Sequence, residues 1–492
     1  MAYAQREVHR RAVLCFPVRA EAGTWDMLGR CPERSRPAGR NSTPLWSSRP
    51  AFYLATVGAA VGLGSIWRLP YQVGSSGGSA FVLVFTIACL LIATPLLAAE
   101  FLIGRHSRRS PPDAAGAVAV ESGLTRRWNV IGVLGTIAVF AMMAPYTVVA
   151  SWVLAYSWKC ASGALTGLHR PEVAHLWRAF LSSPLEMGAW HVLFLFLVAV
   201  ISARGVSRGI EAATKVRAPI LLLLLVVLTV YALVIGDARA GLRFAFAPSA
   251  AAMSPRVVLA AIGQAFYATG VGAAMMLAYG SYVEKGTSLV RAALIITGSI
   301  LVVSLFATLT IFPLVFRYGM NPAEGPELVF DVLATVFAEM PGGRLVGTLF
   351  FVLLLFAALT PTIAGFEPIV AWLQERRSVS RARAVGIAVS AAWLLGVGGV
   401  LSFSQWSGWH PFGWLPSFEK RTFFDVMDFV PANVLLPMGA LLTSVFAGWR
   451  ISRTILDGEL RETTPFARRW CVWALRYLCP IAIAAVFVMA VW

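Results

Sequence analysis

Long apolar runs constrain this chain more than any other feature of its sequence. Stretches such as "SAFVLVFTIACLLIATPLLAA" and "PILLLLLVVLTVYALVI" are close to the length of about 20 apolar residues that one helix needs to cross a bilayer. Charged residues make up 13% of the chain, about half the share of roughly 25% that is typical of soluble proteins. The sequence therefore predicts an all-α polytopic membrane protein. Its eleven expected spans cover residues 51–72, 78–104, 129–158, 188–203, 215–236, 253–283, 289–316, 344–374, 382–403, 423–449 and 468–492.

The basic residues are distributed unequally between the two sides of these spans. The N-terminal segment and the loops after even-numbered spans hold 29 of the 41 Lys and Arg residues. Loops rich in Lys and Arg lie on the cytoplasmic side of a membrane. The pattern therefore predicts a cytoplasmic N-terminus and a C-terminus on the opposite side. The net charge of +17 is then a signal of topology and of contact with anionic lipid. We therefore do not expect a nucleic-acid partner.

Residues 1–49 differ in kind from the rest of the chain. They are rich in Arg, Pro and Ser, and their one apolar run, "AVLCFPV", is shorter than a secretory signal requires. We expect a disordered cytoplasmic extension. A regulatory tail, and a start codon set too far upstream, are the alternatives. Residues 50–492 are expected to form a single membrane domain.

Two of the expected spans contain glycine-rich interruptions. The first is "GAAVGLGS", at 58–65, and the second is "YATGVGAA", at 267–274, about 210 residues later in the sixth span. Close helix packing through the pair Gly58 and Gly62 is the simpler interpretation of the first. The repetition in the sixth span instead predicts inverted five-span repeats with broken helices, covering about 50–240 and 250–449, followed by an extra helix at about 468–492. Backbone groups freed at such breaks face substrate or ions rather than lipid.

From about Trp46 onward the sequence resembles the neurotransmitter:sodium symporter family, in its bacterial amino-acid-transporting branch. The similar segments are "WSSRPAFYLATVGAAVGLGSIWRLPYQVGSSGGSAF", "RGVSRGIE", "AIGQAFYATGVG", "YGSYVEK" and "FFDVMDFVPANVLLPMGALLTSVFAGW". The resemblance implies a bundle of spans 1, 2, 6 and 7 that rocks against the other spans. It also implies alternating access, coupling of uptake to sodium, and a location in the bacterial inner membrane.

The resemblance also implies a substrate site at the two breaks. The carboxylate of an amino acid would meet the backbone at Leu63 and Gly64, together with the hydroxyl of Tyr146. Tyr146 lies well inside its expected span, where a phenol needs a hydrogen-bond partner. Small residues at three positions of the pocket, Gly270, Ala273 and Gly365, leave room for a bulky substrate. The full predicted substrate site is Ala59, Ala60, Leu63, Gly64, Met142, Tyr146, Tyr267, Gly270, Ala273 and Gly365.

One sodium site of the family matches this sequence better than the other. Its ligands would be the carbonyls of Gly58, Val61 and Ala357 and the hydroxyl of Thr360. Pro361 replaces a neighbouring hydroxyl there, and Thr362 is the alternative ligand if the proline shifts the local backbone. The other site has Ser65 in place of an asparagine and Ala268 in place of a hydroxyl. Because sodium needs several hard oxygen ligands, we expect one sodium site rather than two.

Charged and aromatic residues at both ends of the path are implied to act as gates. Arg68 is expected to pair with Asp428 at the outer gate, and Asp425 is its rival for this role. Tyr282 and Glu375 fall where the family has its inner gate. A charge inside a span is costly unless it is paired or functional, which favours such roles.

We therefore predict a sodium-dependent symporter of an amino acid with a bulky hydrophobic or aromatic side chain. A proton-coupled or sodium-independent carrier or exchanger of the same fold is the first alternative, because the ion ligands are altered. A non-transporting sensor is the second. No catalytic triad, metal cluster or phosphate-binding loop is present in the sequence, so we expect neither an enzyme nor an organic cofactor. The oligomeric state is left open.

Overall fold

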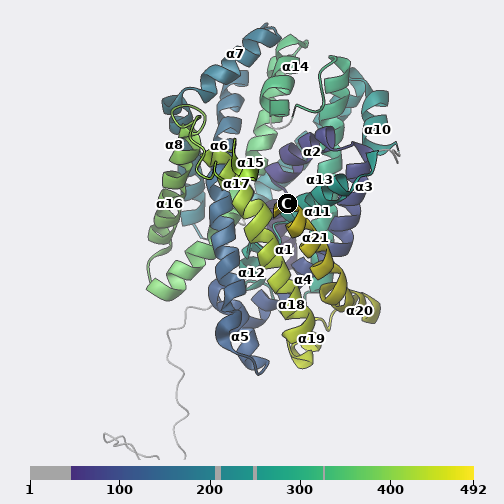
Figure 1. The fold of residues 1–492 in the computed structure, drawn as a ribbon, viewed down its shortest axis with the longest axis vertical. Coiled ribbons are helices and arrows are strands. Elements are labelled where there is room, and N and C mark those ends of the chain that lie inside the picture. The colour runs from purple at the N-terminus through teal and green to yellow at the C-terminus, as the bar shows by residue number, and fades with distance from the viewer. Residues whose placement is uncertain (1–45, 206–211, 248–251, 325–326, 492) are drawn as a thin grey trace, which may run out of the picture. The chain divides into compact units, whose positions relative to one another are not determined.

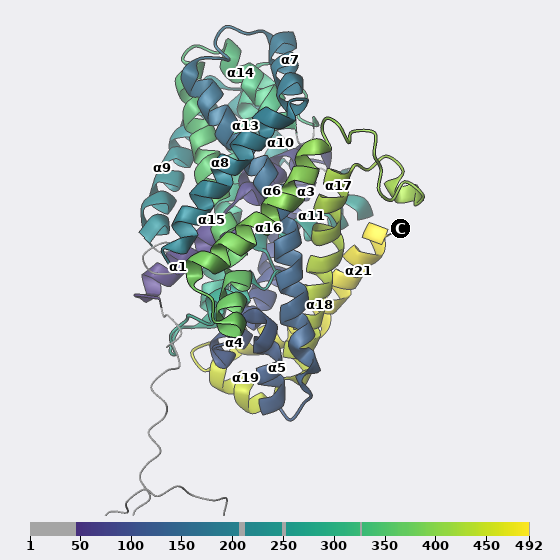
Figure 2. The same ribbon diagram turned by 90° about the vertical axis from the view of Figure 1, so that its left-hand side faces the viewer.

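The computed structural model describes residues 46–205, 212–247, 252–324 and 327–491. These residues form helices and connecting loops, with no strand among them, and Figures 1 and 2 show the long helices running roughly side by side. The membrane-crossing elements in chain order are α1 (Arg49–Ala60) with η1 (Gly64–Arg68) and α2 (Leu69–Ser75); α3 (Ser79–Ala88) with η2 (Cys89–Ala93) and α4 (Thr94–Ser107); η3 (Arg126–Asn129) with α6 (Val130–Ser162); α8 (Pro184–Ala203); α9 (Ala212–Ile235); α11 (Pro255–Thr269) with α12 (Met275–Gly280); α13 (Leu289–Arg317); α15 (Gly343–Arg377); α16 (Arg381–Leu401); α17 (Phe423–Val430) with η8 (Pro431–Leu435), α18 (Leu436–Val445) and η9 (Phe446–Arg450); and α20 (Pro465–Trp473) with η10 (Ala474–Leu478) and α21 (Cys479–Val491).

The number of spans depends on how the broken helices are counted. Within the described residues, nine helices are long and apolar enough to cross a membrane, or ten when Arg49–Ala60 and Gly64–Ser75 count as one bent span. The predicted sixth span, 253–283, consists of a helix of 15 residues and another of 6 residues. Neither half is long enough to cross a membrane alone. The nine long helices, the bent first span and this broken sixth span correspond to the eleven spans that the sequence predicts.

Shorter helices cover the two ends of the membrane-crossing elements. In Figure 1, α7 (Arg170–Leu181), α10 (Ala238–Phe246) and α14 (Leu333–Glu339) lie at one end, where η6 (Leu328–Val332) leads into α14. Two others, α5 (Pro111–Glu121) and α19 (Arg453–Glu459), lie at the opposite end, and η7 (Pro416–Phe418) lies in the loop before α17. The predicted extension at 1–49 falls almost wholly outside the described residues, and the division into two repeats stays a prediction.

The centre of the protein is built by α15 and α6, which pack against each other. In the most apolar stretch of α15, 78% of the residues are buried, against 28% in α9. Most exposed residues of α9 are large and apolar: Leu223 is 64% exposed and Val234 is 74% exposed. A soluble protein seldom exposes such a face, so α9 belongs to the surface that contacts lipid.

The first span breaks after Ala60. Ser48 caps the start of α1, and its side chain accepts a hydrogen bond from the Ala51 amide; Pro50 lies in the first turn, where its missing N–H costs nothing. Val61 follows the last helical residue and has an extended backbone with ψ of 99°. The two halves of the span differ in direction by 51°. Backbone groups on both sides of this break therefore lack the partners of a continuous helix.

The sixth span breaks through three residues with positive φ. Gly270, Gly272 and Ala274 have φ values of 65°, 85° and 54°. Glycine adopts this region without the penalty that a Cβ atom brings. A Cβ at Gly272 would also lie 2.2 Å from the carbonyl oxygen of Leu436, so only glycine fits this approach to α18. The predicted interruptions are thus real breaks in both spans.

Candidate functional site

Tyr146 on α6 contacts the break in the first span directly. Its hydroxyl accepts a hydrogen bond from the backbone N–H of Leu63 at 3.3 Å. Gly62 makes this approach possible, because a Cβ there would lie 2.9 Å from the Tyr146 hydroxyl and 2.6 Å from Pro361 Cγ. The structure therefore brings together two of the predicted substrate residues, Leu63 and Tyr146, at the place where α1 ends.

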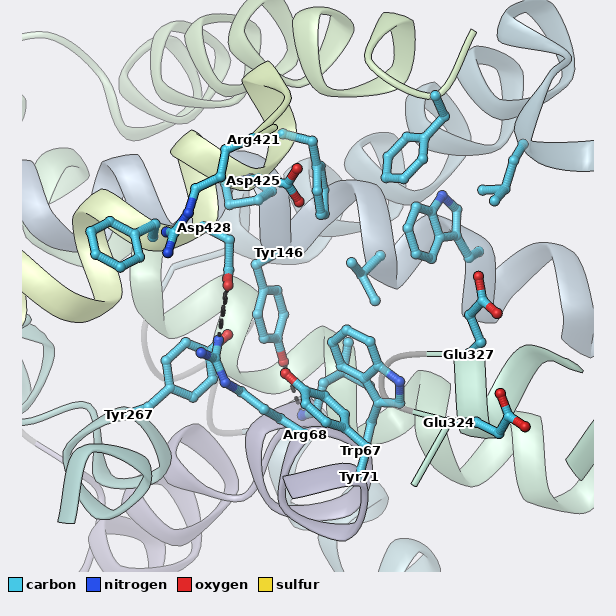
Figure 3. Close-up of a pocket in the computed structure, with 18 of the residues that line it drawn as sticks. Trp67, Arg68, Tyr71, Tyr146, Tyr267, Glu324, Glu327, Arg421, Asp425 and Asp428 are labelled. Carbon is cyan, nitrogen blue, oxygen red and sulfur yellow. Dashed lines mark hydrogen bonds and ion pairs between the residues drawn. The ribbon is translucent and has the colours of Figure 1, made fainter. Parts of the chain in front are cut away.

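Tyr267, the last aromatic residue before the break in the sixth span, joins the two broken helices. Its ring lies against Gly64, where a Cβ would be 3.1 Å from Tyr267 Cε1. Arg68 also places its guanidinium carbon 3.9 Å from the centre of the Tyr267 ring, a cation–π contact. Figure 3 shows Arg68 between Tyr267 and Asp428.

A cavity of about 680 Å³ opens beside these residues. Three predicted substrate residues, Leu63, Tyr146 and Tyr267, line it together with Arg68 and Asp428. Figure 3 labels the last four of these. Aromatic side chains of α6, α7 and α17 form much of the remaining wall: Trp152, Trp177 and Phe424. The volume lies within the range of about 300–1,000 Å³ that is usual for small-molecule sites.

Two acidic residues that lie outside the membrane spans also line this cavity. Glu324 and Glu327 line it, and both precede α14. Burial raises the pKa of Glu327 above its usual value, and repulsion from Asp331 and then Glu324 acts in the same direction. Glu324 pairs with Arg170 at 3.6 Å, so it is the charge of Glu327 that is less favourable here than it would be in water.

The other predicted substrate residues are buried around the breaks but do not line the cavity. Ala59, Ala60, Gly64, Met142, Gly270, Ala273 and Gly365 belong to this group. Methionine side chains fill the space beside two of them. A Cβ at Gly365 would lie 2.5 Å from Met143 Sδ, and one at Gly270 would lie 3.1 Å from Met275 Cε. The small residues therefore accommodate methionines rather than leaving open space in this conformation.

Two of the predicted sodium ligands, Gly58 and Thr360, lie close together where α1 meets α15. A Cβ at Gly58 would lie 3.1 Å from Thr360 Cγ2, so the backbone of α1 lies directly against Thr360. The Thr360 hydroxyl donates to the Phe356 carbonyl at 3.3 Å, which leaves its oxygen lone pairs available to a cation. Pro361 has no N–H, so the Ala357 carbonyl cannot receive the usual hydrogen bond from four residues later. The chemistry of these groups fits a hard cation.

The altered positions of the other family site offer few oxygen atoms. Ser65 is fully buried, and its hydroxyl has no hydrogen-bond partner in the part of the chain that the structure describes. Ala268 is buried and supplies only a methyl group. The nearby Gln264 uses its amide nitrogen to donate to the Gly64 carbonyl at 2.8 Å. One hydroxyl in this position is a poor match for a cation that needs several oxygens.

The residues predicted at the outer gate form an ion pair. Arg68 Nη1 lies 3.2 Å from one carboxylate oxygen of Asp428 and 3.3 Å from the other. The side chains are 13% and 39% exposed, respectively. The rival Asp425 instead accepts hydrogen bonds from the backbone and hydroxyl of Thr422, at the start of α17. The structure thus pairs Arg68 with Asp428.

The residues predicted at the inner gate do not contact each other. The Tyr282 hydroxyl donates to Glu367 Oε1 at 2.9 Å, and Glu367 pairs with Arg381 at 2.7 Å. Glu375 instead accepts a hydrogen bond from the Ser110 backbone at 2.8 Å. Sequence reasoning missed Glu367 and Arg381. Their signal was the acidic residue in "AGFEPIVAW", inside an apolar span, where a charge is rarely unpaired.

A second missed carboxylate supports the break in the sixth span. Glu100 on α4 is 2% exposed, and its Oε1 accepts a hydrogen bond from the Gly272 backbone at 2.7 Å. Gly272 lies between α11 and α12, where no regular helix provides this N–H with a partner. Glu100 is therefore a positioning residue for the unwound segment, and its signal was again a carboxylate within an apolar run.

Comparison with known proteins assigns the chain to a family. The sequence profile described as the sodium:neurotransmitter symporter family matches residues 43–179 and 180–492. The chain belongs to this symporter family. It is 36% identical over 446 residues to the uncharacterized sodium-dependent transporter YhdH of Bacillus subtilis (strain 168), across 90% of this chain and 96% of the relative. A second relative, an uncharacterized sodium-dependent transporter of Haemophilus influenzae, is 31% identical across 90% of this chain and 97% of its own length.

A solved structure of this symporter family has the same fold. The crystal structure of MhsT in complex with L-phenylalanine matches with a TM-score of 0.84 and 35% identity, over 92% of this chain and all of that chain. The predicted all-α transporter fold with two broken helices is confirmed. The protein is a sodium-dependent symporter and a multi-pass membrane protein, not an enzyme.

Proposed function

We propose that this symporter takes up an amino acid with a bulky hydrophobic or aromatic side chain, together with one sodium ion. The observation that carries the proposal is the hydrogen bond between the Tyr146 hydroxyl and the Leu63 amide, at the broken end of α1. It places a phenol and an open backbone segment at one point, and MhsT, the relative described above, binds phenylalanine. The residues around this point are therefore our candidates for substrate contacts.

The two sides of the break suit the two charges of an amino acid. The last carbonyls of α1, at Ala59 and Ala60, lack the N–H partners of a continuing helix and carry partial negative charge. They favour an ammonium group. The amides of Leu63 and Gly64 begin the next helical segment, whose N-terminus favours a carboxylate. The Tyr146 hydroxyl is a further donor to that carboxylate.

The substrate side chain would be held by Tyr267, Met142, Gly270, Ala273 and Gly365. An aromatic ring at Tyr267 suits another large apolar group. Met143 and Met275 fill space beside the two glycines, and methionine side chains are flexible enough to move aside. Each additional buried CH₂ group contributes about 0.8 kcal/mol, so a large side chain is favoured over glycine or alanine.

We place the sodium ion among the carbonyls of Gly58, Val61 and Ala357 and the hydroxyl of Thr360. The missing N–H of Pro361 frees the Ala357 carbonyl and so offsets the hydroxyl that the proline replaces. One ion is expected, because Ser65 and Ala268 leave too few ligands for a second. We further propose that the end bearing α5 and α19 faces the cytoplasm of a bacterial inner membrane, as the distribution of basic residues favours.

Uptake into proteoliposomes tests the function. Labelled phenylalanine is offered under an imposed sodium gradient, under a proton gradient, or under neither, and twenty unlabelled amino acids compete. We expect sodium-driven uptake with a Hill coefficient near one, and the strongest competition from large apolar side chains. Uptake driven by protons without sodium would overturn the coupling. Strongest competition by glycine or alanine would overturn the substrate class.

A pair of threonine variants tests the sodium site. Thr360→Val removes the proposed ligand, whereas Thr362→Val removes a buried hydroxyl that donates to the Ala358 carbonyl one turn away. We expect the first substitution to abolish sodium stimulation and the second to retain it. Equal sodium dependence in the two variants would reject Thr360 as a ligand.

A further inference from the structure

An exposed stripe runs along the last membrane helix, at the end of the protein that carries α19. On α20, η10 and α21, Arg469, Trp473, Tyr477 and Ile481 follow one another at intervals of four residues and are all exposed. Residues at this spacing share one face of a helix. Along the helix the stripe changes from a cation, through two aromatic rings, to an aliphatic side chain. This is also the order of polarity from a lipid headgroup to its acyl chains.

The neighbouring helix carries the same order of side chains. Trp449 and Arg450 end η9, and both are exposed. Figure 2 shows α18, which leads into η9, beside α21, and the two helices contact each other. The aromatic rings of the two helices lie close together. The ring centre of Tyr477 is 5.6 Å from that of Trp449 and 6.2 Å from that of Trp473. The two helices therefore present one continuous aromatic surface with arginines at one end.

Arg476 lies within this surface. Its Nε donates to the Gly448 carbonyl at 2.6 Å, and its own carbonyl accepts from Trp449 Nε1 at 3.2 Å. Its guanidinium carbon is 5.6 Å from the centre of the Trp449 ring. No carboxylate of the described residues pairs with it. A half-buried cation without a carboxylate, at the level of an aromatic belt, suits an anionic group from outside the chain.

The surrounding charges leave the arginines available. On α19, Asp457 pairs with Arg468 at 3.2 Å, and Glu459 pairs with Arg105 at 2.6 Å. Burial alone would raise the pKa of Glu459, but hydrogen bonds and charges from His106 and Arg105 hold it below the usual value. Exposed Glu462 is the remaining carboxylate of this segment. Arg450 and Arg469 form no ion pair within the described part of the chain.

We propose that this face, defined by Arg450, Arg469, Arg476, Trp449, Trp473 and Tyr477, binds an anionic phospholipid. The arginines would hold the phosphate and the anionic headgroup. The rings would lie at the level of the glycerol backbone, and Ile481 would contact an acyl chain. Such a lipid would tie the last two membrane helices together at this end. The inference does not depend on the transport proposal, because lipid binding is measured without transport.

Native mass spectrometry of the purified full-length protein tests the site. The protein in detergent is titrated with phosphatidylglycerol or with zwitterionic phosphatidylcholine, and bound lipid is counted. We expect one phosphatidylglycerol to be retained in preference to phosphatidylcholine. R450Q/R469Q should weaken that binding by about twenty-fivefold, because each basic side chain near an anionic surface contributes about a fivefold factor. These two arginines are exposed and unpaired, so folding should not suffer.

Two controls make the result decisive. R377Q/R383Q removes two exposed arginines around the loop between α15 and α16 and should leave phosphatidylglycerol binding unchanged. R476Q should weaken binding, and R476K, which keeps the charge, should restore most of it. Equal loss in both double variants, or equal retention of the two lipids by the wild type, would overturn the site. Displacement by soluble glycerol phosphate as effective as that by phosphatidylglycerol would overturn the role of the rings and Ile481.

Discussion

In the orientation proposed above, the outer and inner ends of the proposed transport path carry different arrangements of charge. At the outer end, Arg68 and Asp428 form a single ion pair, and the Asp428 side chain is 39% exposed. At the inner end, Glu367 is only 2% exposed and is held by three donors: both terminal nitrogens of Arg381 and the Tyr282 hydroxyl. Exposed ion pairs typically contribute about 0–1 kcal/mol, whereas breaking one side of a buried pair costs about 3–5 kcal/mol.

Further contacts hold the Glu367 cluster in place more firmly than the Arg68–Asp428 pair. Arg381 also donates from Nε to the Ser202 carbonyl at 2.8 Å, which ties the inner cluster to the end of α8. Trp46 packs edge-on against Tyr279 and Tyr282, with ring centres 5.2 Å and 6.1 Å apart. The outer pair has one comparable support, the ring of Tyr267 beneath Arg68. The inner end is therefore the more firmly held of the two in this conformation.

The largest expected effect is that of Arg381→Met. This change leaves Glu367 buried without its countercharge, so we expect the free energy of unfolding to fall by about 3–5 kcal/mol. Thermal unfolding in detergent, followed by tryptophan fluorescence, measures it. Arg383→Met, at an exposed position two residues away, should change stability by no more than about 0.5 kcal/mol. Equal losses in the two variants would mean that the Glu367 pair contributes nothing specific.

Tyr282→Phe should have an intermediate effect. It deletes one hydrogen bond to the Glu367 carboxylate while the ring and the Arg381 pair remain. Hydrogen bonds to charged groups contribute about 1.5–3 kcal/mol, and we expect a loss of stability in that range. The same unfolding measurement applies, with Tyr53→Phe as the control, because no hydrogen bond of its hydroxyl is seen in the described residues. A loss no larger than that of the control would contradict the role of this hydroxyl.

Asp428→Asn should hardly change stability but should slow uptake. Its partly exposed pair contributes about 1 kcal/mol at most, so the unfolding temperature should stay close to that of the wild type. If the pair closes the outer end during the cycle, its loss should lower the initial rate of uptake by about fivefold to tenfold. Asp425→Asn removes a carboxylate that caps α17 and should affect uptake less. Equal reductions in the two variants would remove the gate assignment.

Local patterns account for the parts of the fold that the sequence predicts. Apolar length predicts the spans, and the glycine clusters predict both breaks, because these features depend on the chain's own backbone and on its transfer into lipid. The meeting of Tyr146 with Leu63 was expected only from the resemblance to the family, because a contact between two spans is not visible in the pattern of either span.

Contacts that depend on the rotation of packed helices were not predictable in this way. Glu367 was visible as a charge in a span, but its partners come from the start of α16 and from the loop after α12. Met143 fills the space beside Gly365 because of how α6 is rotated against α15, and no periodicity distinguishes it from Met142. Side-chain pairing across helices is set by tertiary packing, which a single sequence does not specify.

The smallest net effect on access to the cavity is expected when Arg381→Met and Asp428→Asn are combined in one variant. Loss of the inner cluster favours an inward-open state, whereas loss of the outer pair favours an outward-open one, so the two changes shift the same equilibrium in opposite directions. A cysteine placed at Val149, which lines the cavity, can be labelled from outside with an impermeant maleimide. We expect slower labelling than in the parent for Arg381→Met and faster labelling for Asp428→Asn.

The double variant should label at a rate between those of the two single variants and closer to that of the parent. Its loss of stability should equal the sum of the single losses to within about 0.5 kcal/mol, because the two sites share no side-chain partner. Additive stability together with opposed accessibility would show that the inner cluster and the outer pair act on one conformational equilibrium. Both single variants accelerating the labelling would show instead that each change merely loosens its surroundings, and the contrast between the two ends would then describe packing rather than gating.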